Sequence, residues 1–157
     1  MDIISLEMGI AFLFIFLAPI VYILAKENAK KKKLNNRVTK ICSDNAIKKT
    51  NTISIANHIF VSDIEGKKLL NYHKKQDNFS VMDLEDFDTC SIQRSWNNGE
   101  SSKVVLQKVS MVFTPKGQGS PHVISLFDDS YENPLEAEAI LYEADRFTRY
   151  LNTEALH

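Results

Sequence analysis

The chain has 157 residues, 44% hydrophobic and 25% charged, which suits one ordinary globular domain with an appendage but not two full domains. Its formal net charge of -1 hides a strong segregation: residues 1–25 carry -2, residues 26–50 carry +7 and residues 51–157 carry -6. Because the basic charge forms one block beside an apolar stretch, and no stripe over the rest of the chain, the composition argues against a nucleic-acid-binding protein.

The first segment, residues 1–25, contains an apolar run from Met8 to Ala25 without a charged residue. As a helix this run would extend about 27 Å, close to the ~30 Å hydrocarbon core of a bilayer. We therefore predict an N-terminal transmembrane α-helix over about residues 8–25. Pro19 removes one backbone donor and is expected to kink this helix.

Two alternatives for this run are a signal peptide and a helix buried in a protein core. A signal peptide carries positive charge before the apolar run and small residues at a cleavage site after it. Here Asp2 and Glu7 precede the run, and the exit reads "ILAKENAKKKK". The flanking residues therefore favour a span over a cleaved leader.

A lysine cluster, Lys26, Lys30, Lys31, Lys32 and Lys33, follows the run directly. The positive-inside rule then places the N-terminus outside and the C-terminal domain in the cytoplasm, as in a single-pass protein of the bacterial inner membrane. The same lysines are candidate membrane-surface residues, because anionic headgroups attract each of them by about 1 kcal/mol near the surface. The alternative is that they act only as a stop-transfer signal.

Residues 26–50 are predicted to form a Lys-rich juxtamembrane stalk and a linker. Leu34, Val38, Ile41 and Cys42 recur at helical spacing, which indicates an amphipathic helix to about Asp44. The narrow stripe would pack on the chain's own domain, on a partner helix or on the lipid surface.

Residues 51–157 are predicted to form a β-rich domain, since the hydrophobic period changes to two and turn residues recur. "HIFVSDIEGKKLLNYHKK" predicts a hairpin that turns at Gly66, and "FSVMDL", "FDTCSIQRSW", "KVVLQKVSMVFT" and "HVISLFDD" predict further strands. The Asn-Gly pair of "WNNGES" is typical of a tight turn between two of them. We expect about six or seven antiparallel strands in one strongly bent sheet, or partly open barrel.

The domain is predicted to end in one amphipathic helix over residues 134–151. Asn133 suits the N-cap, Pro134 the first helical position and Glu136 a capping box. The apolar stripe of this helix consists of Ile140, Ala144, Phe147 and Leu151. A single stripe of this kind can cover the open end of a bent sheet, which makes the fold class a transmembrane helix plus an α+β domain.

This element order resembles the pleckstrin-homology-like fold. The segments "SDIEGKKLLNYHKK", "SVMDLEDFDTCSIQRS", "VSMVFTPKGQGSPHVISLFDD" and "LEAEAILYEADRFTRYLN" also resemble a group of uncharacterised bacterial membrane proteins, which have one N-terminal span, a lysine-rich exit and a β-rich domain. The resemblance covers nearly the whole chain. It implies a fold but no activity and no site residues.

The sequence predicts no catalytic, cofactor-binding or metal site. The acidic run "MDLEDFD" lacks the glycine and the distant glutamate of a calcium loop, and "KGQGS" lacks the Lys-Ser/Thr of a phosphate loop. His58, His73 and His122 fall on three strands without paired spacing, so we expect exposed or half-buried strand residues. Cys42 and Cys90 show no metal or redox spacing and are expected to be reduced, structural thiols.

We therefore predict a protein that binds and is not an enzyme: a membrane-anchored cytoplasmic binding or scaffold module of unknown ligand. The expected partners are the lipid bilayer through the span, anionic headgroups through the lysine cluster, and an unidentified protein reached by strand addition to a sheet edge or through the helix. The alternative is a small accessory subunit of an inner-membrane complex, assembled through its transmembrane helix.

Overall fold

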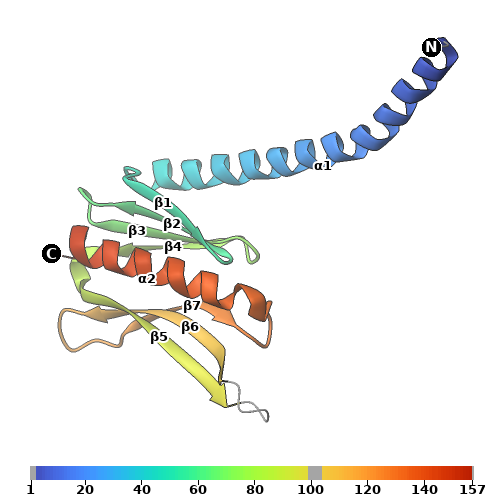
Figure 1. Ribbon diagram of the computed structural model, residues 1–157. Coiled ribbons are helices and arrows are strands. Elements are labelled where there is room, and N and C mark those ends of the chain that lie inside the picture. Colours follow the sequence, from blue (N-terminus) through green and yellow to red (C-terminus); the bar gives the residue numbers. More distant parts are fainter. Residues whose placement is uncertain (1–2, 99–103, 157) are drawn as a thin grey trace. The chain divides into compact units, whose positions relative to one another are not determined.

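The computed structural model describes residues 3–98 and 104–156 (Figure 1). The chain divides into two compact units, Met1–Ser43 and Asp44–His157. The first unit consists of helix α1, which spans Ile3–Asp44 and contains Pro19. The predicted apolar helix and the predicted stalk are thus parts of one continuous helix.

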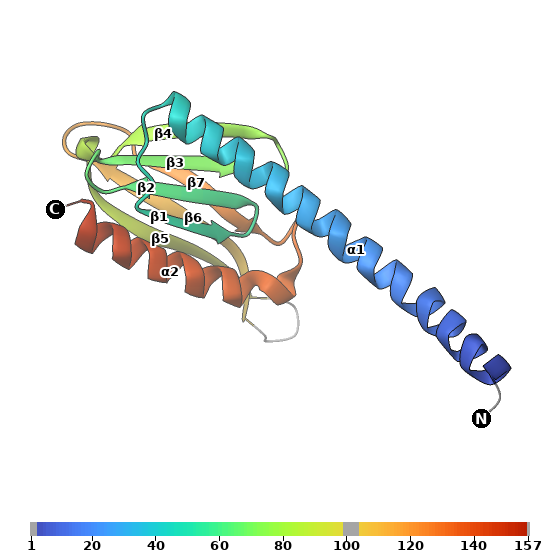
Figure 2. The same cartoon turned by 90° about the horizontal axis from the view of Figure 1, so that it is seen from above.

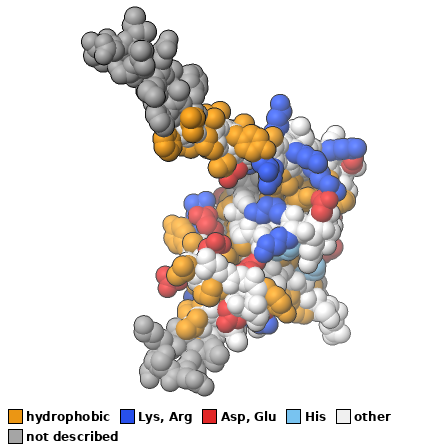
Figure 3. Space-filling view, turned by 90° about the vertical axis from the view of Figure 1, so that its right-hand side faces the viewer, with side chains coloured by type: hydrophobic (Ala, Val, Ile, Leu, Met, Phe, Trp, Pro, Cys, Tyr) orange, Lys and Arg blue, Asp and Glu red, His pale blue; other side chains and the backbone are white. Residues whose placement is uncertain are grey.

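The predicted membrane span is wrong: in the part of the chain that the structure describes, no helix is both long and apolar enough to cross a bilayer. The apolar run whose side chains are described begins at Ile15 and ends at Ala25, where Lys26 follows. Its larger apolar side chains are exposed, and Figure 3 shows hydrophobic side chains gathered along this part of α1.

Three further predictions depended on that span and are withdrawn with it. They are the single-pass membrane protein, the bacterial inner-membrane location with the N-terminus outside and the C-terminal domain in the cytoplasm, and the transmembrane part of the fold class. An accessory subunit assembled through a transmembrane helix loses its premise for the same reason.

The second unit contains two antiparallel sheets where the sequence predicted one bent sheet. The first sheet has the order β1 (Asn51–Ile55), β2 (His58–Asp63), β3 (Lys68–His73), β4 (Asn78–Asp83). The second has the order β5 (Phe87–Asn98), β6 (Val104–Pro115), β7 (His122–Asp128).

A short 3-10 helix, η1 (Leu84–Asp86), separates the two sheets. The Asp83 side chain accepts the backbone N–H of Glu85 (3.0 Å) and so caps η1. The chain changes direction at this cap, because an Asp that bonds the backbone two residues on offers it an alternative to the strand ladder. The acidic residues of "MDLEDFD" therefore serve a turn.

The predicted C-terminal helix is present, although it starts with a different kind of turn. The 3-10 helix η2 (Pro134–Glu136) leads into α2 (Ala137–Glu154), and the Asn133 side chain accepts the Leu135 N–H (3.1 Å) as expected of a cap. Glu136 makes no side-chain capping bond, so the predicted capping box is absent. Pro134 fits the tight first turn, since its missing N–H has no partner at this position in any helix.

Helix α2 lies alongside both sheets, in contact with β1, β5, β6 and β7 (Figures 1 and 2). Ala144, Phe147 and Leu151 of its predicted stripe are fully or almost fully buried, and the Phe147 ring lies 5.3 Å from that of Phe60 on β2. The core consists of these side chains and the inner-face residues of both sheets, among them Leu69, Met111 and Phe113.

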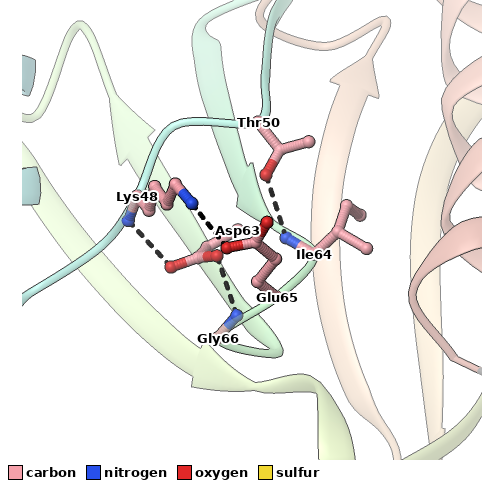
Figure 4. A network of polar contacts seen from close by, with 6 residues as sticks. All are labelled: Lys48, Thr50, Asp63, Ile64, Glu65 and Gly66. Atoms are coloured by element: carbon pink, nitrogen blue, oxygen red, sulfur yellow. Dashed lines mark hydrogen bonds and ion pairs between the residues drawn. The ribbon is translucent and has the colours of Figure 1, made fainter.

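A polar network fastens the segment before β1 to the turn between β2 and β3 (Figure 4). The Asp63 carboxylate, only 3% exposed, accepts the backbone N–H groups of Lys48 (2.7 Å) and Gly66 (2.8 Å). Thr50 Oγ1 accepts the Ile64 N–H (3.2 Å). A Cβ on residue 66 would lie 2.6 Å from Asp63 Oδ2, so the turn needs glycine to let the carboxylate approach.

We predict that Asp63→Ala lowers the free energy of unfolding by about 1–3 kcal/mol, because it leaves two backbone N–H groups without their acceptor. Urea unfolding followed by circular dichroism measures the change. The matched control is Glu65→Ala, which removes only the exposed ion pair with Lys48 and should leave the unfolding midpoint unchanged. Equal midpoints for the two variants would contradict the assigned role of Asp63.

Candidate functional site

The inner face of the first sheet is apolar over one part and polar over the rest. Residues two apart on a strand share a face, and so do cross-strand partners. The pair Leu69 and Met82 belongs to the core, whereas the next two pairs on this face are Asn71 with Ser80 and His73 with Asn78. Polar residues thus occupy inward positions at which a fold of two packed sheets would normally place apolar core residues.

These inward polar residues line a cleft between β4 and β7 with a volume of about 370 Å³. None of its lining residues, all within the described chain, is Asp, Glu, Lys or Arg. The cleft therefore offers imidazole, amide and hydroxyl groups without a permanent charge. Its lining consists of His58, Asn71, His73, Gln76, Asn78, Phe79, Ser80, His122, Val123, Ile124 and Ser125.

His58 on β2 joins the two sheets across the inner end of this cleft. Its Nε2 lies 3.0 Å from the backbone oxygen of Ser125 on β7, and its Nδ1 lies 2.8 Å from Asn71 Oδ1. A carbonyl oxygen only accepts, so Nε2 carries the proton and donates. The Asn71 amide can present its oxygen or its nitrogen to Nδ1, so the ring can be bonded in both charge states.

The pKa of His58 lies below its usual value, chiefly because burial disfavours the charged ring. The hydrogen bond with Asn71 opposes this shift, and the neighbouring His73 adds to it. The two imidazole rings meet edge to face with centroids 4.6 Å apart. His58 is therefore a neutral, buried hydrogen-bonding residue at neutral pH, contrary to the expectation of an exposed or half-buried one.

His73 presents a defined donor at the cleft. Its Nδ1 accepts the backbone N–H of Gln76 (3.1 Å), so in the neutral ring the proton sits on Nε2. Figure 3 shows histidine side chains at the surface of the second unit.

Strand β4 turns unpaired backbone groups toward the cleft. Along an edge strand, every second residue directs its N–H and C=O away from the neighbouring strand. The Leu84 N–H donates to the Lys67 carbonyl (2.7 Å), one step beyond the β3–β4 ladder. From Leu84 backwards, the backbone groups of the even-numbered residues of β4 therefore bond β3. The backbone N–H and C=O groups of Phe79 and Val81 point away from β3, toward the free edge of the sheet.

Strand β7 borders the other side of the cleft with its own free edge. The Ser125 carbonyl accepts the bond from His58, so the backbone of Ser125 faces away from β6. Val123, two residues earlier, faces the same way and is half exposed. The cleft thus lies between two free strand edges, of which β7 is partly occupied by His58.

The predicted membrane-surface residues lie elsewhere, on α1. Lys26, Lys30, Lys31, Lys32 and Lys33 are all exposed. Nothing in the structure tests whether they contact anionic headgroups, and that role stays a prediction. In the described chain no group of three or more His, Cys, Asp or Glu side chains is placed to hold a metal ion.

The two cysteines are buried and form no disulfide. Burial raises the pKa of the Cys90 thiol to about 12, so no thiolate is present at neutral pH. The backbone of Cys90 is also engaged, since its N–H and C=O each bond the Asn152 amide of α2 at 2.8 Å.

The cleft was not predicted from the sequence, where the three histidines show no paired spacing. The strand parity contained a signal: in "KLLNYH" the position of Leu69 repeats at Asn71 and His73, so two polar residues follow a core residue on one face. That signal does not show that β7 approaches this face. Comparisons with protein-family models, curated proteins and solved structures found no match to this chain.

We predict that the free energy of unfolding decreases as the pH falls below about 6.5. In this range His58 binds a proton in the unfolded state but not yet in the folded state, where its pKa is lower. The loss continues until the pH falls below the pKa of the folded state. His58→Gln should flatten this part of the curve of unfolding free energy against pH, measured by urea titration between pH 8 and pH 5. The control His122→Gln changes an exposed histidine of the same cleft and should keep the wild-type slope. A His58→Gln curve parallel to wild type would refute the assignment.

Proposed function

We propose that the second unit is a binding module, not an enzyme, that holds an extended polypeptide segment against the free edge of β4. The observation that carries the proposal is the outward-facing backbone of Phe79 and Val81 beside a preformed polar cleft. An added strand gains affinity from main-chain hydrogen bonds and specificity from alternate side chains.

The other edge of the second sheet is less suited to strand addition. Asn152 on α2 bonds both the N–H and the C=O of Cys90, as a paired strand would, and so occupies the free edge of β5. Native proteins commonly protect exposed strand edges by covering them in this way. The corresponding groups of Phe79 and Val81 have no such cover among the described residues.

The two faces of β4 specify the segment. On the inner face it would lie beside Asn78 and Ser80, which favour amide or hydroxyl side chains. On the outer face it would meet Phe79 and Val81, 50% and 37% exposed, which favour β-branched or aromatic side chains. We infer a partner segment in which polar and apolar residues alternate.

The order of four strands, three strands and a C-terminal helix supports the resemblance to the pleckstrin-homology-like fold. No comparison tests that resemblance, and a shared fold would not by itself assign the ligand. The proposal therefore rests on the β4 edge and the cleft alone.

We predict that Val81→Pro lowers affinity at least about tenfold, since it removes one outward N–H and the bond that this group would donate. The binding peptides come from a display selection on the immobilised full-length chain, and isothermal titration measures their affinity. Thr52→Pro is the matched control and should keep the wild-type affinity. Thr52 is exposed on edge strand β1, and its N–H points away from β2 because it alternates with the residues that bond β2.

Both variants should keep the wild-type circular dichroism, because neither substituted N–H belongs to a strand ladder. Equal affinity of the selected peptides for Val81→Pro and wild type would overturn strand addition at β4. So would a selection that yields no binding peptide.

A further inference from the structure

Three connections meet at one end of the second unit, beside the cleft. They are the β1–β2 turn with Asn57, the β3–β4 turn with Lys75, and the loop after β7 with Tyr131 and Glu132. The backbone N–H groups of Tyr131 and Glu132 both donate to the Asp128 carbonyl (3.1 and 3.0 Å), which holds this loop in a defined turn.

The Glu132 side chain borders two cavities at this end, of about 360 and 320 Å³. It is only 18% exposed. One oxygen, Oε1, accepts a hydrogen bond from the Asn57 amide and lies 3.9 Å from Lys75 Nζ. The other, Oε2, is fully buried and has no hydrogen-bond partner within the described chain.

A buried carboxylate oxygen without a donor is costly, because it has lost water and gained nothing in exchange. Native structures rarely leave such an atom unexplained. Every other described buried side-chain nitrogen or oxygen has a partner, so Glu132 Oε2 is an exception in a chain that otherwise satisfies its polar groups. A ligand that places a donor in an adjoining cavity and draws the Glu132 carboxylate toward it would remove this cost.

The smaller cavity has the chemistry of a site for an organic cation. Glu132 and Glu136 contribute two carboxylates against the single ammonium of Lys75. The ring of Tyr131, 85% exposed, lies at the same cavity, and Ile140 adds an apolar wall. Carboxylate, aromatic face and apolar surface together suit a flat cation on an aliphatic stem.

We propose that this cavity binds a guanidinium group, as in an arginine side chain, with the Glu132 carboxylate as its main acceptor. A planar guanidinium presents several donors in a fixed fork, which can bond a carboxylate and still stack on a tyrosine ring. An ammonium lacks that planar shape, and Lys75 already supplies one near Oε1. The proposal does not depend on strand addition at β4.

The test uses the 15N-labelled full-length chain and three probes: the Nα-acetyl amides of arginine, citrulline and lysine. Citrulline keeps the planar shape of arginine but is uncharged. We expect saturable shifts of the Tyr131 and Glu132 amide signals with the arginine probe, and at least about tenfold weaker binding of the other two.

Glu132→Gln is the matched variant, because it keeps the shape of the side chain and removes its charge. It should bind the arginine probe at least about tenfold more weakly than wild type. Lys75→Ala removes the competing cation and should bind the probe more tightly, so one variant loses affinity and another gains it. An unchanged circular dichroism spectrum of both variants shows that the fold is retained.

Three results would overturn the proposal. The first is no saturable shift with the arginine probe, as expected if only a water molecule bonds Oε2. The second is equal binding of citrulline or lysine, which would exclude selectivity for a guanidinium. The third is unchanged arginine affinity in Glu132→Gln.

Discussion

The hydrogen bond from His58 Nε2 to the Ser125 carbonyl is a polar link between the two sheets, and the arrangement of the cleft depends on it. On one side of this bond the space between the sheets is filled by Phe60, Met111 and the rest of the core. On the other side the inward residues are polar. The bond holds the edge of β7 over the first sheet, so the two sheets stay together beyond the point where hydrophobic packing ends.

This division explains why the cleft coexists with a stable fold. Apolar contacts with both sheets come from α2, whose Phe147 and Leu151 are buried, so the opposite corner need not be closed by packing. The polar side chains at that corner bond one another or face solvent. Helix α2 also closes the β5 edge through Asn152, whereas the β4 edge combines outward-facing backbone with the exposed side chains of Phe79 and Val81.

Local patterns were enough to predict most of the β-rich unit. The β-branched and aromatic residues of "HIFVSD", Asn133 before Pro134 and the stripe around Phe147 each reflect short-range physics. The strands and the C-terminal helix lie where these residues indicated. The division into two sheets was not predictable, because it depends on one Asp83 cap and on pairings across the fold. The predicted span was wrong, since no helix in the described part of the chain is both long and apolar enough to cross a bilayer.

The cleft and the unpaired Glu132 oxygen were hidden from the sequence for a common reason. Each arises where residues far apart in the chain converge: His58 with Ser125 in one case, and Asn57, Lys75 and Glu132 in the other. His58, His73, Gln76 and Ser125 line both the cleft and the larger of the two cavities beside Glu132, so the two spaces adjoin. The smaller cavity, which holds the proposed guanidinium site, shares Asn57, Lys75, Tyr131 and Glu132 with the larger one, so Glu132 is the residue that connects it to the space beside the cleft.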